Sequence, residues 1–118
     1  MKKILFALIL IIFLTGCGTD KAQIYGLYDK YEFDNLVFRN TDVKEIDNTY
    51  IITSTLTNKS DKAKNIKWFK LNVLLEDGIK NTIIVYFGSV IEPNQTLQTT
   101  TSVDFNANLI KSIDYEFN

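Results

Sequence analysis

The feature of this 118-residue chain that most restricts its fold is a two-residue alternation of β-favouring side chains. It is clearest in TYIITSTLTN, residues 49–58, where β-branched residues fill both faces of an extended chain. A second stretch, IKWFKLNVLLEDG from Ile66 to Gly78, places an unbroken apolar set on one face: Phe69, Leu71, Val73 and Leu75. Alternation of this kind is typical of strands that bury one face. We therefore expect the chain to fold as a sheet structure, with that apolar set in its core.

Turn signals separate the other strand candidates. Asp77-Gly78 predicts a tight hairpin, Gly88-Ser89 a break, and Pro93 a loop or sheet edge. Two short strands are expected between residues 33 and 46, interrupted at Arg39–Asp42. The remaining strands are expected at 79–87, 97–105 and 110–117. About seven short strands without a helical period predict an all-β fold, an antiparallel immunoglobulin-like β-sandwich.

The N-terminus is predicted to be a leader and not part of the domain. Lys2 and Lys3 precede an apolar run from Ile4 to Leu14, ILFALILIIFL. A transmembrane helix needs about 20 apolar residues, so this run is too short for one. A basic tip, a short apolar run and small residues after it are typical of a secretory signal peptide. We expect residues 1–16 to be such a peptide.

The residues that follow the apolar run carry a family resemblance. Leu14, Thr15, Gly16 and Cys17 resemble the lipobox of bacterial lipoproteins, L-[AST]-[GA]-C. The resemblance implies that a diacylglycerol is attached to the sulfur of Cys17 and that Cys17 becomes the first residue of the mature chain. The alternatives are a buried free cysteine and a reactive thiol. A reactive thiol needs an electropositive setting, which Asp20 and Lys21 do not supply because their charges cancel.

These readings divide the chain into three parts. After the signal peptide, residues 17–30 are expected to form the lipidated cysteine and a tether, and residues 31–118 the β-sandwich domain. The tether has an alternative, since Ile24, Tyr25, Leu27 and Tyr28 make it less polar than a pure linker. It could instead be a short strand or turn that packs on the domain.

Charge and location exclude some classes of partner. Removal of residues 1–16 takes Lys2 and Lys3 from the 13 basic residues and nothing from the 14 acidic ones, so the net charge changes from −1 to −3. A mildly acidic, exported chain is not expected to bind nucleic acid. With its one cysteine committed to lipid, the domain has no disulfide. We expect the protein on the outer face of the cytoplasmic membrane or on the outer membrane.

A second resemblance concerns the domain itself. Asn58 and Ser60 close one strand, Asp77 and Gly78 close the next, and IEPNQ precedes a later one. This order resembles that of the FxLYD-type immunoglobulin-like domains of bacterial exported proteins. Leu75 and Asp77 of this chain match the Leu and Asp of the family's motif. Val73, Glu76 and Asn94 depart from it, standing at the Phe, Tyr and Gly positions. The resemblance implies a sandwich that presents a partner-binding surface and carries no catalytic site.

The sequence offers little material for catalysis. There is no histidine, so a His-based triad, a histidine general base and a histidine metal ligand are all excluded. Asn40, Asp42 and Asp47 lie close together in the sequence but lack the alternating spacing of a calcium loop. We expect no metal, no cofactor and no enzymatic activity.

Two surface features remain as candidates for binding. The first is a group of lysines: Lys59, Lys62, Lys64, Lys67 and Lys70. They could form a basic rim against anionic lipid headgroups, or a polar turn and an edge strand that lysines protect from pairing. The second is Trp68, which points outward if Phe69 points inward, unless a bulge reverses the register. The alternative places Trp68 in the core, as in many immunoglobulin-like sandwiches. The possible binding surface is therefore Trp68 with Lys67 and Lys70.

Together these observations predict a membrane-anchored, non-enzymatic lipoprotein of the cell envelope. Its anchor is the lipid on Cys17, and its immunoglobulin-like domain binds an unidentified protein or envelope component. The alternative is a small-ligand carrier or an immunity lipoprotein that sequesters a toxin. A concave apolar site between the sheets favours the carrier, and a flat aromatic patch around Trp68 favours the partner binder.

Overall fold

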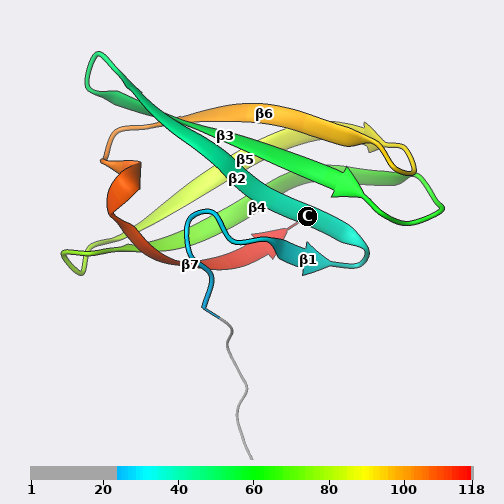
Figure 1. Ribbon diagram of the computed structural model, residues 1–118, viewed down its shortest axis with the longest axis horizontal. Coiled ribbons are helices and arrows are strands. Elements are labelled where there is room, and N and C mark those ends of the chain that lie inside the picture. Colours follow the sequence, from blue (N-terminus) through cyan, green and yellow to red (C-terminus); the bar gives the residue numbers. More distant parts are fainter. Residues whose placement is uncertain (1–23, 118) are drawn as a thin grey trace, which may run out of the picture.

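A computed structural model describes residues 24–117 of the chain. Seven strands form two antiparallel sheets that pack face to face (Figure 1). The strands are β1 (Tyr31–Phe33), β2 (Leu36–Ile46), β3 (Thr49–Asn58), β4 (Lys64–Leu75), β5 (Lys80–Ile91), β6 (Thr96–Val103) and β7 (Ile110–Phe117). One sheet has the order β1-β2-β3-β6 and the other β5-β4-β7. The predicted all-β sandwich is confirmed, and the predicted strands at 49–58 and 110–117 match β3 and β7.

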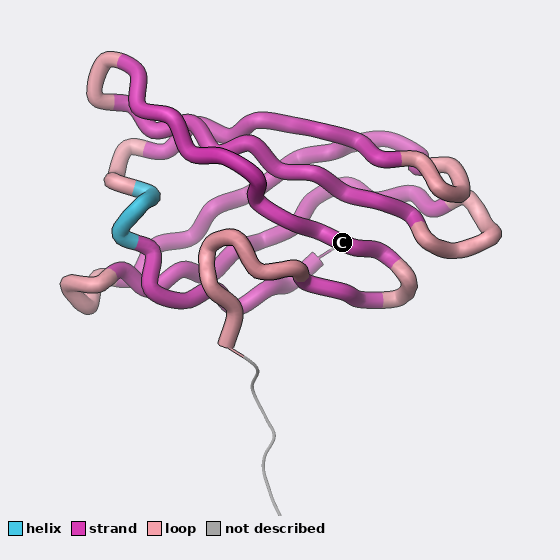
Figure 2. Tube along the Cα trace, in the orientation of Figure 1, coloured by secondary structure: helices cyan, strands magenta, loops and turns pink. Residues whose placement is uncertain are grey.

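The strand order is that of an immunoglobulin-like sandwich. β2, β3 and β6 are neighbours as strands A, B and E are in that fold, and β5, β4 and β7 are neighbours as C′, C and F are. β1 adds a further strand beside β2. In Figure 2 the loops gather at the two ends of the sandwich, where β-hairpins and a short 3₁₀ helix, η2 (Ala107–Leu109), connect the strands.

Two tight hairpins build the first part of the four-stranded sheet. Asp34 and Asn35 form the turn between β1 and β2, with φ of 52° and 63°. Asp47 and Asn48 form the turn between β2 and β3, with φ of 50° and 66°. Two-residue turns with positive φ match the twist of the strands they join, and Asp and Asn tolerate that conformation. Neither turn was predicted from the sequence.

The expected interruption at Arg39–Asp42 is wrong. β2 runs through this stretch as one strand, and the irregularity is a β-bulge between Asn40 and Asp42. Thr41 is the extra residue, because Asn40 pairs with Ser54 and Asp42 with Thr53. A bulge disturbs the alternation of side chains without ending the pairing, which explains why the sequence pattern alone suggests two strands.

Aromatic rings join the two sheets at the centre of the core. Phe38 of β2 stacks on Phe69 of β4 with ring centroids 4.7 Å apart. Phe69, Leu71, Val73 and Leu75 are all buried, so the inward face predicted for this strand is confirmed. Tyr115 packs edge to face on Phe38 at 5.5 Å.

Two buried asparagines fix loops and chain ends to the sheets. Asn58, at the end of β3, donates to the carbonyl oxygens of Lys62 and Ile91, and its Oδ1 accepts from the backbone and hydroxyl of Ser60. Asn40 donates to the Leu27 carbonyl oxygen at 2.9 Å, and its Oδ1 accepts from Ser54 at 2.8 Å. Buried polar groups are tolerated when their hydrogen bonds are made, and these bonds specify where the neighbouring segments dock.

Residues 24–30 pack on the sandwich, as the alternative for this segment proposed. The backbone N–H of Ile113 in β7 donates to the Tyr25 carbonyl oxygen at 2.8 Å, so this segment lies against the edge of β7 that faces away from β4. Leu27 is buried, and Tyr25 contacts the rings of Tyr31 and Tyr115. The packed domain therefore begins before residue 31.

The predicted leader, Cys17 and residues 18–23 lie outside the described residues. Within residues 24–117, no helix has the length and apolar character that crossing a membrane requires.

Candidate partner-binding surface

The outer face of the three-stranded sheet is set by the alternation of β4. Phe69, Leu71 and Val73 point into the core, so the residues between them point outward. The outward set consists of Trp68, Lys70, Asn72 and Leu74, all of them half-buried. Since β4 is the central strand, these side chains lie in the middle of that face.

A bulge near the start of β4 places Trp68 on this face. The register changes between Ile66 and Trp68, because Ile66 pairs with Ser89 while Trp68 pairs with Tyr86. Gly88 on β5 adopts φ +59°, a conformation that glycine accepts without steric cost. The bulge turns Ile66 into the core, and Trp68 stays on the outside. The break expected at Gly88-Ser89 is therefore wrong, since β5 continues to Ile91 through the bulge.

Trp68 lies beside an exposed tyrosine and a half-buried isoleucine. Its partner in the register, Tyr86, has 66% of its surface exposed. The next row of the sheet contains Lys70 between Ile84 of β5 and Glu116 of β7. Trp68, Lys70, Ile84 and Tyr86 are called the Trp68 surface below. A pair of large aromatic residues on a solvent-facing sheet surface is typical of protein interfaces, where Trp and Tyr are enriched.

The structure separates the three predicted binding residues. Trp68 and Lys70 share the outer face of β4, as the spacing of two residues predicts. Lys67 is exposed and occupies the bulge, without a register partner on β5. Lys64 is paired with Asp34, with Nζ and Oδ2 3.0 Å apart, so it is not a free cation for headgroups. The interpretation of β4 as an edge strand is wrong, because β4 lies between β5 and β7.

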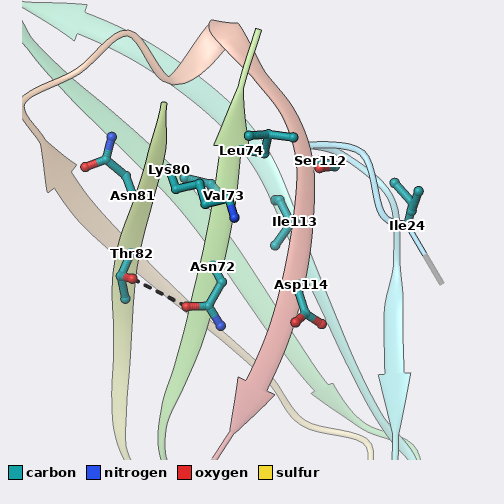
Figure 3. Close-up of a pocket in the computed structure, with 10 residues that line it drawn as sticks. All are labelled: Ile24, Asn72, Val73, Leu74, Lys80, Asn81, Thr82, Ser112, Ile113 and Asp114. Atoms are coloured by element: carbon teal, nitrogen blue, oxygen red, sulfur yellow. Dashed lines mark hydrogen bonds between the residues drawn. The ribbon is translucent and has the colours of Figure 1, made fainter. Parts of the chain in front are cut away.

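A shallow hollow of about 660 Å³ continues the same face towards the other end of β4 (Figure 3). Its lining includes Asn72 and Leu74 of β4, Lys80 and Thr82 of β5, and Ser112 and Asp114 of β7. Ile24 lines it from the N-terminal segment. The hollow thus lies on the outside of one sheet and not between the two sheets.

Hydrogen bonds preorganise the floor of the hollow. Asn72 donates from Nδ2 to Oε2 of Glu116 at 2.9 Å. Its Oδ1 accepts from the Thr82 hydroxyl at 3.4 Å, the bond drawn as a dashed line in Figure 3. Lys80 and Asp114 come from the two edge strands, so a cation and an anion flank the central strand. This arrangement suits a polar or zwitterionic segment laid across the sheet, with Leu74 as an apolar contact.

Sequence reasoning missed Tyr86, Asn72, Thr82 and Asp114. The signal that could have found Tyr86 is the alternation of β5, in which buried Ile83 and Val85 imply that Tyr86 points outward. The hollow had no such signal. It depends on which strands are neighbours and on the position of Ile24 beside β7.

The residues considered for calcium are not brought together. Asn40 is fully buried and its side chain bonds Ser54 and Leu27, while Asp42 and Asp47 are exposed at and beyond the bulge. Among residues 24–117 no group of three or more His, Cys, Asp or Glu is placed to hold a metal ion.

The shifted pKa values belong to tyrosines outside the hollow. Burial raises the pKa of Tyr115 far above its ordinary value, with further contributions from Asp29, Tyr25 and Tyr31. Burial also raises the pKa of Tyr31. A hydroxyl with a raised pKa stays protonated and neutral, so these groups serve packing in the aromatic core.

Comparisons with known proteins assign no family to this chain. No family model matches the chain, and no curated protein matches it. A solved structure that resembles it is described as a DUF1425 family member from Shewanella sp. pv-4. The two chains share 11% identity with a TM-score of 0.47, and the match covers 81% of this chain and 93% of the other.

Proposed function

We propose that this chain is an exported, non-enzymatic lipoprotein whose immunoglobulin-like domain, of the FxLYD type, binds a protein or another component of the cell envelope. The lipid on Cys17 holds it at the membrane, and the Trp68 surface makes the contact with the partner. The lipobox-like sequence Leu14–Cys17 supports the anchor.

The observation that carries the binding proposal is the pair of half-buried Trp68 and exposed Tyr86 on the outer face of the three-stranded sheet. Neither residue belongs to the core cluster, and Tyr86 exposes two thirds of its surface. Large rings at solvent-facing positions supply contact area with little loss of side-chain entropy, and they recur as the strongest contributors at interfaces.

The anchor is tested with the full chain in its own cells. Cys17→Ser should abolish incorporation of radiolabelled palmitate and move the protein from the membrane fraction to the medium or periplasm, or leave an uncleaved precursor. Ser102→Ala, an exposed position that leaves the leader untouched, is the control and should retain label and location. A Cys17→Ser protein that is still processed and membrane-bound would refute the anchor.

The binding surface is tested by photo-crosslinking from a single position. A benzoylphenylalanine at position 86 of the anchored protein should give a discrete cross-linked product in native membranes. The same group at position 100, exposed on the outer face of the other sheet, is the matched control. Trp68→Ala should remove the product from position 86. Identical products from both positions, or a product that Trp68→Ala leaves unchanged, would contradict the proposal.

The second candidate is the small-ligand carrier or toxin-sequestering immunity lipoprotein, and the hollow is the observation in its favour. Its volume of about 660 Å³ falls within the range of about 300–1,000 Å³ typical of ligand pockets. Leu74→Trp should fill it. A small molecule that co-purifies with the wild-type chain and is absent from Leu74→Trp in native mass spectrometry would favour the carrier. A cross-link from position 86 that survives Leu74→Trp would favour the partner binder.

A further inference from the structure

We propose that the side of the sandwich formed by residues 24–33 and β7 rests on the lipid bilayer, and that this contact orients the domain. The inference rests on the proposed function, because it takes the lipid on Cys17 as the anchor. In Figure 1, β1 and β7 lie along the lower margin, and the described chain begins on that same side. This side is called the anchor side below.

Residues 24–33, which form part of the anchor side, include three exposed apolar or aromatic side chains. Ile24 exposes 79% of its surface, Tyr28 49% and Phe33 48%. All three belong to the first ten described residues, whereas the other exposed large hydrophobic residues of the described part of the chain are spread over β2, β5, a hairpin turn and η2. Tyrosine is enriched at the membrane–water interface, because its ring is apolar and its hydroxyl hydrogen-bonds water.

The anchor side is held rigidly to both sheets. Tyr25 is bonded to β7 through Ile113, and Leu27 is bonded to β2 through Asn40. The ring of Phe33 packs on Phe117 with centroids 4.3 Å apart. A bilayer contact made by this segment therefore orients the whole domain, and not merely a loop.

The length of the chain before Ile24 keeps this side close to the lipid. Residues 18–23 separate Cys17 from Ile24, and an extended chain advances about 3.3–3.6 Å per residue. Ile24 thus lies within about 25 Å of the anchored residue. A short connection between two contacts gives an effective concentration of about a millimolar, so a weak contact by a few side chains suffices to orient the domain.

Charge indicates what kind of lipid surface fits. Asp29 and Glu32 are exposed beside Lys30, so the segment has no net positive charge. A contact of this composition depends on apolar and aromatic insertion and not on anionic headgroups. We therefore expect it to form on phosphatidylcholine and to change little with salt.

The orientation leaves the Trp68 surface free. In the three-stranded sheet β7 is followed by β4 and then β5. Neighbouring strands are about 4.8 Å apart, so Tyr86 on β5 lies about 10 Å further from the bilayer than β7 does. The plane of the sheet stands upright on the membrane, and its outer face is open to a partner from the side.

Depth-dependent quenching with the full, lipidated chain tests this arrangement. The chain is reconstituted in phosphatidylcholine vesicles that contain a phosphatidylcholine with a doxyl quencher near its headgroup. Tyr28→Trp and Tyr86→Trp are each made with Trp68→Phe, so each protein has one tryptophan. The two substitutions are matched, because both replace an exposed tyrosine. Tryptophan at position 28 should lose more than half of its emission, and tryptophan at position 86 should keep nearly all of it.

A second pair of variants tests which side chains make the contact. Ile24→Ser with Phe33→Ser should reduce the quenching of tryptophan 28 at least twofold, and Ile46→Ser with Ile79→Ser, exposed aliphatics elsewhere, should leave it unchanged. Equal quenching at positions 28 and 86, or none at either in a protein whose intact mass shows lipid on Cys17, would overturn the orientation while sparing the anchor. An intact mass without lipid, in a protein that fails to float with vesicles, would overturn the anchor and the orientation with it.

Discussion

Two groups of aromatic rings in this domain differ in what surrounds them. The interior group, centred on Phe38, Phe69 and Tyr115, joins the two sheets through stacked and edge-to-face contacts. The outer pair, Trp68 and Tyr86, lies on the solvent side of the three-stranded sheet. Trp68 and Phe69 are neighbours in sequence, yet they face opposite sides of β4. The interior rings therefore carry stability, while the outer rings are available for recognition.

The largest expected effect separates these two neighbours. Phe69→Ala should lower the free energy of unfolding by about 3–5 kcal/mol, because it removes a buried ring between the sheets. Trp68→Ala should cost clearly less, because Trp68 is only half-buried. Urea denaturation of both variants measures the difference. Equal losses would mean that Trp68 is a core residue, and the contrast between the two groups would fail.

The bulge that keeps Trp68 outside should respond to the backbone of Gly88. Gly88→Ala should cost about 1–2 kcal/mol, because an alanine at φ +59° is strained although there is space for its Cβ. Gly88→Asn should cost less, since asparagine tolerates this conformation. Thermal unfolding compares the two. If alanine is tolerated as well as asparagine, the strain argument for the bulge is wrong.

The interior group should give a pH dependence that the outer pair lacks. Burial raises the pKa of Tyr115 above the ordinary value of 10.0, so ionisation is easier in the unfolded chain. Its contribution to stability is present below pH 10 and is lost as the pH rises beyond it. Tyr115→Phe should reduce this loss in stability measurements between neutral and alkaline pH. Tyr86→Phe, the exposed control, should leave the alkaline loss as it is.

At neutral pH the same Tyr115→Phe variant should be nearly neutral. The Tyr115 hydroxyl is buried with no hydrogen-bond partner among residues 24–117, so its removal relieves a desolvated group. The change in unfolding free energy should stay within about 1 kcal/mol. A larger destabilisation in urea would show that the hydroxyl has a partner in solution.

The smallest effect on stability is expected at the outer pair. Tyr86→Ser should change the unfolding free energy by no more than about 0.5 kcal/mol, as is usual for an exposed position. The same substitution should weaken capture of the partner. A variant that loses stability but keeps its partner would reverse the roles assigned to the two groups.

The fold was largely predictable from the sequence because alternation is a local property. Residues 49–58 and 110–117 have the predicted ends, and the inward set of β4 was identified correctly. Two of the errors fell at bulges, near Thr41 and Gly88, where the sequence suggested breaks. A bulge is a relation between two strands, so a single strand cannot reveal it.

The candidate surface was predictable only in part. The outward position of Trp68 followed from Phe69, but its partner Tyr86 required the register of β4 with β5. Predicting the hollow would have required knowing that β5, β4 and β7 are neighbours and that Ile24 lies beside them.

The sequence by itself determined the all-β class, the strand faces and the expectation of a lipid anchor, because these depend on residues close together along the chain. The tertiary structure decided that residues 24–30 pack on the sandwich, that β4 is a central strand, and that Trp68 lies opposite Tyr86. These features depend on hydrogen bonds and packing between segments far apart in the sequence, such as the bond from Asn40 to Leu27 and the pairing of β4 with β7. Local pattern specifies which side of a strand is apolar, and only the assembled sheets specify what covers it.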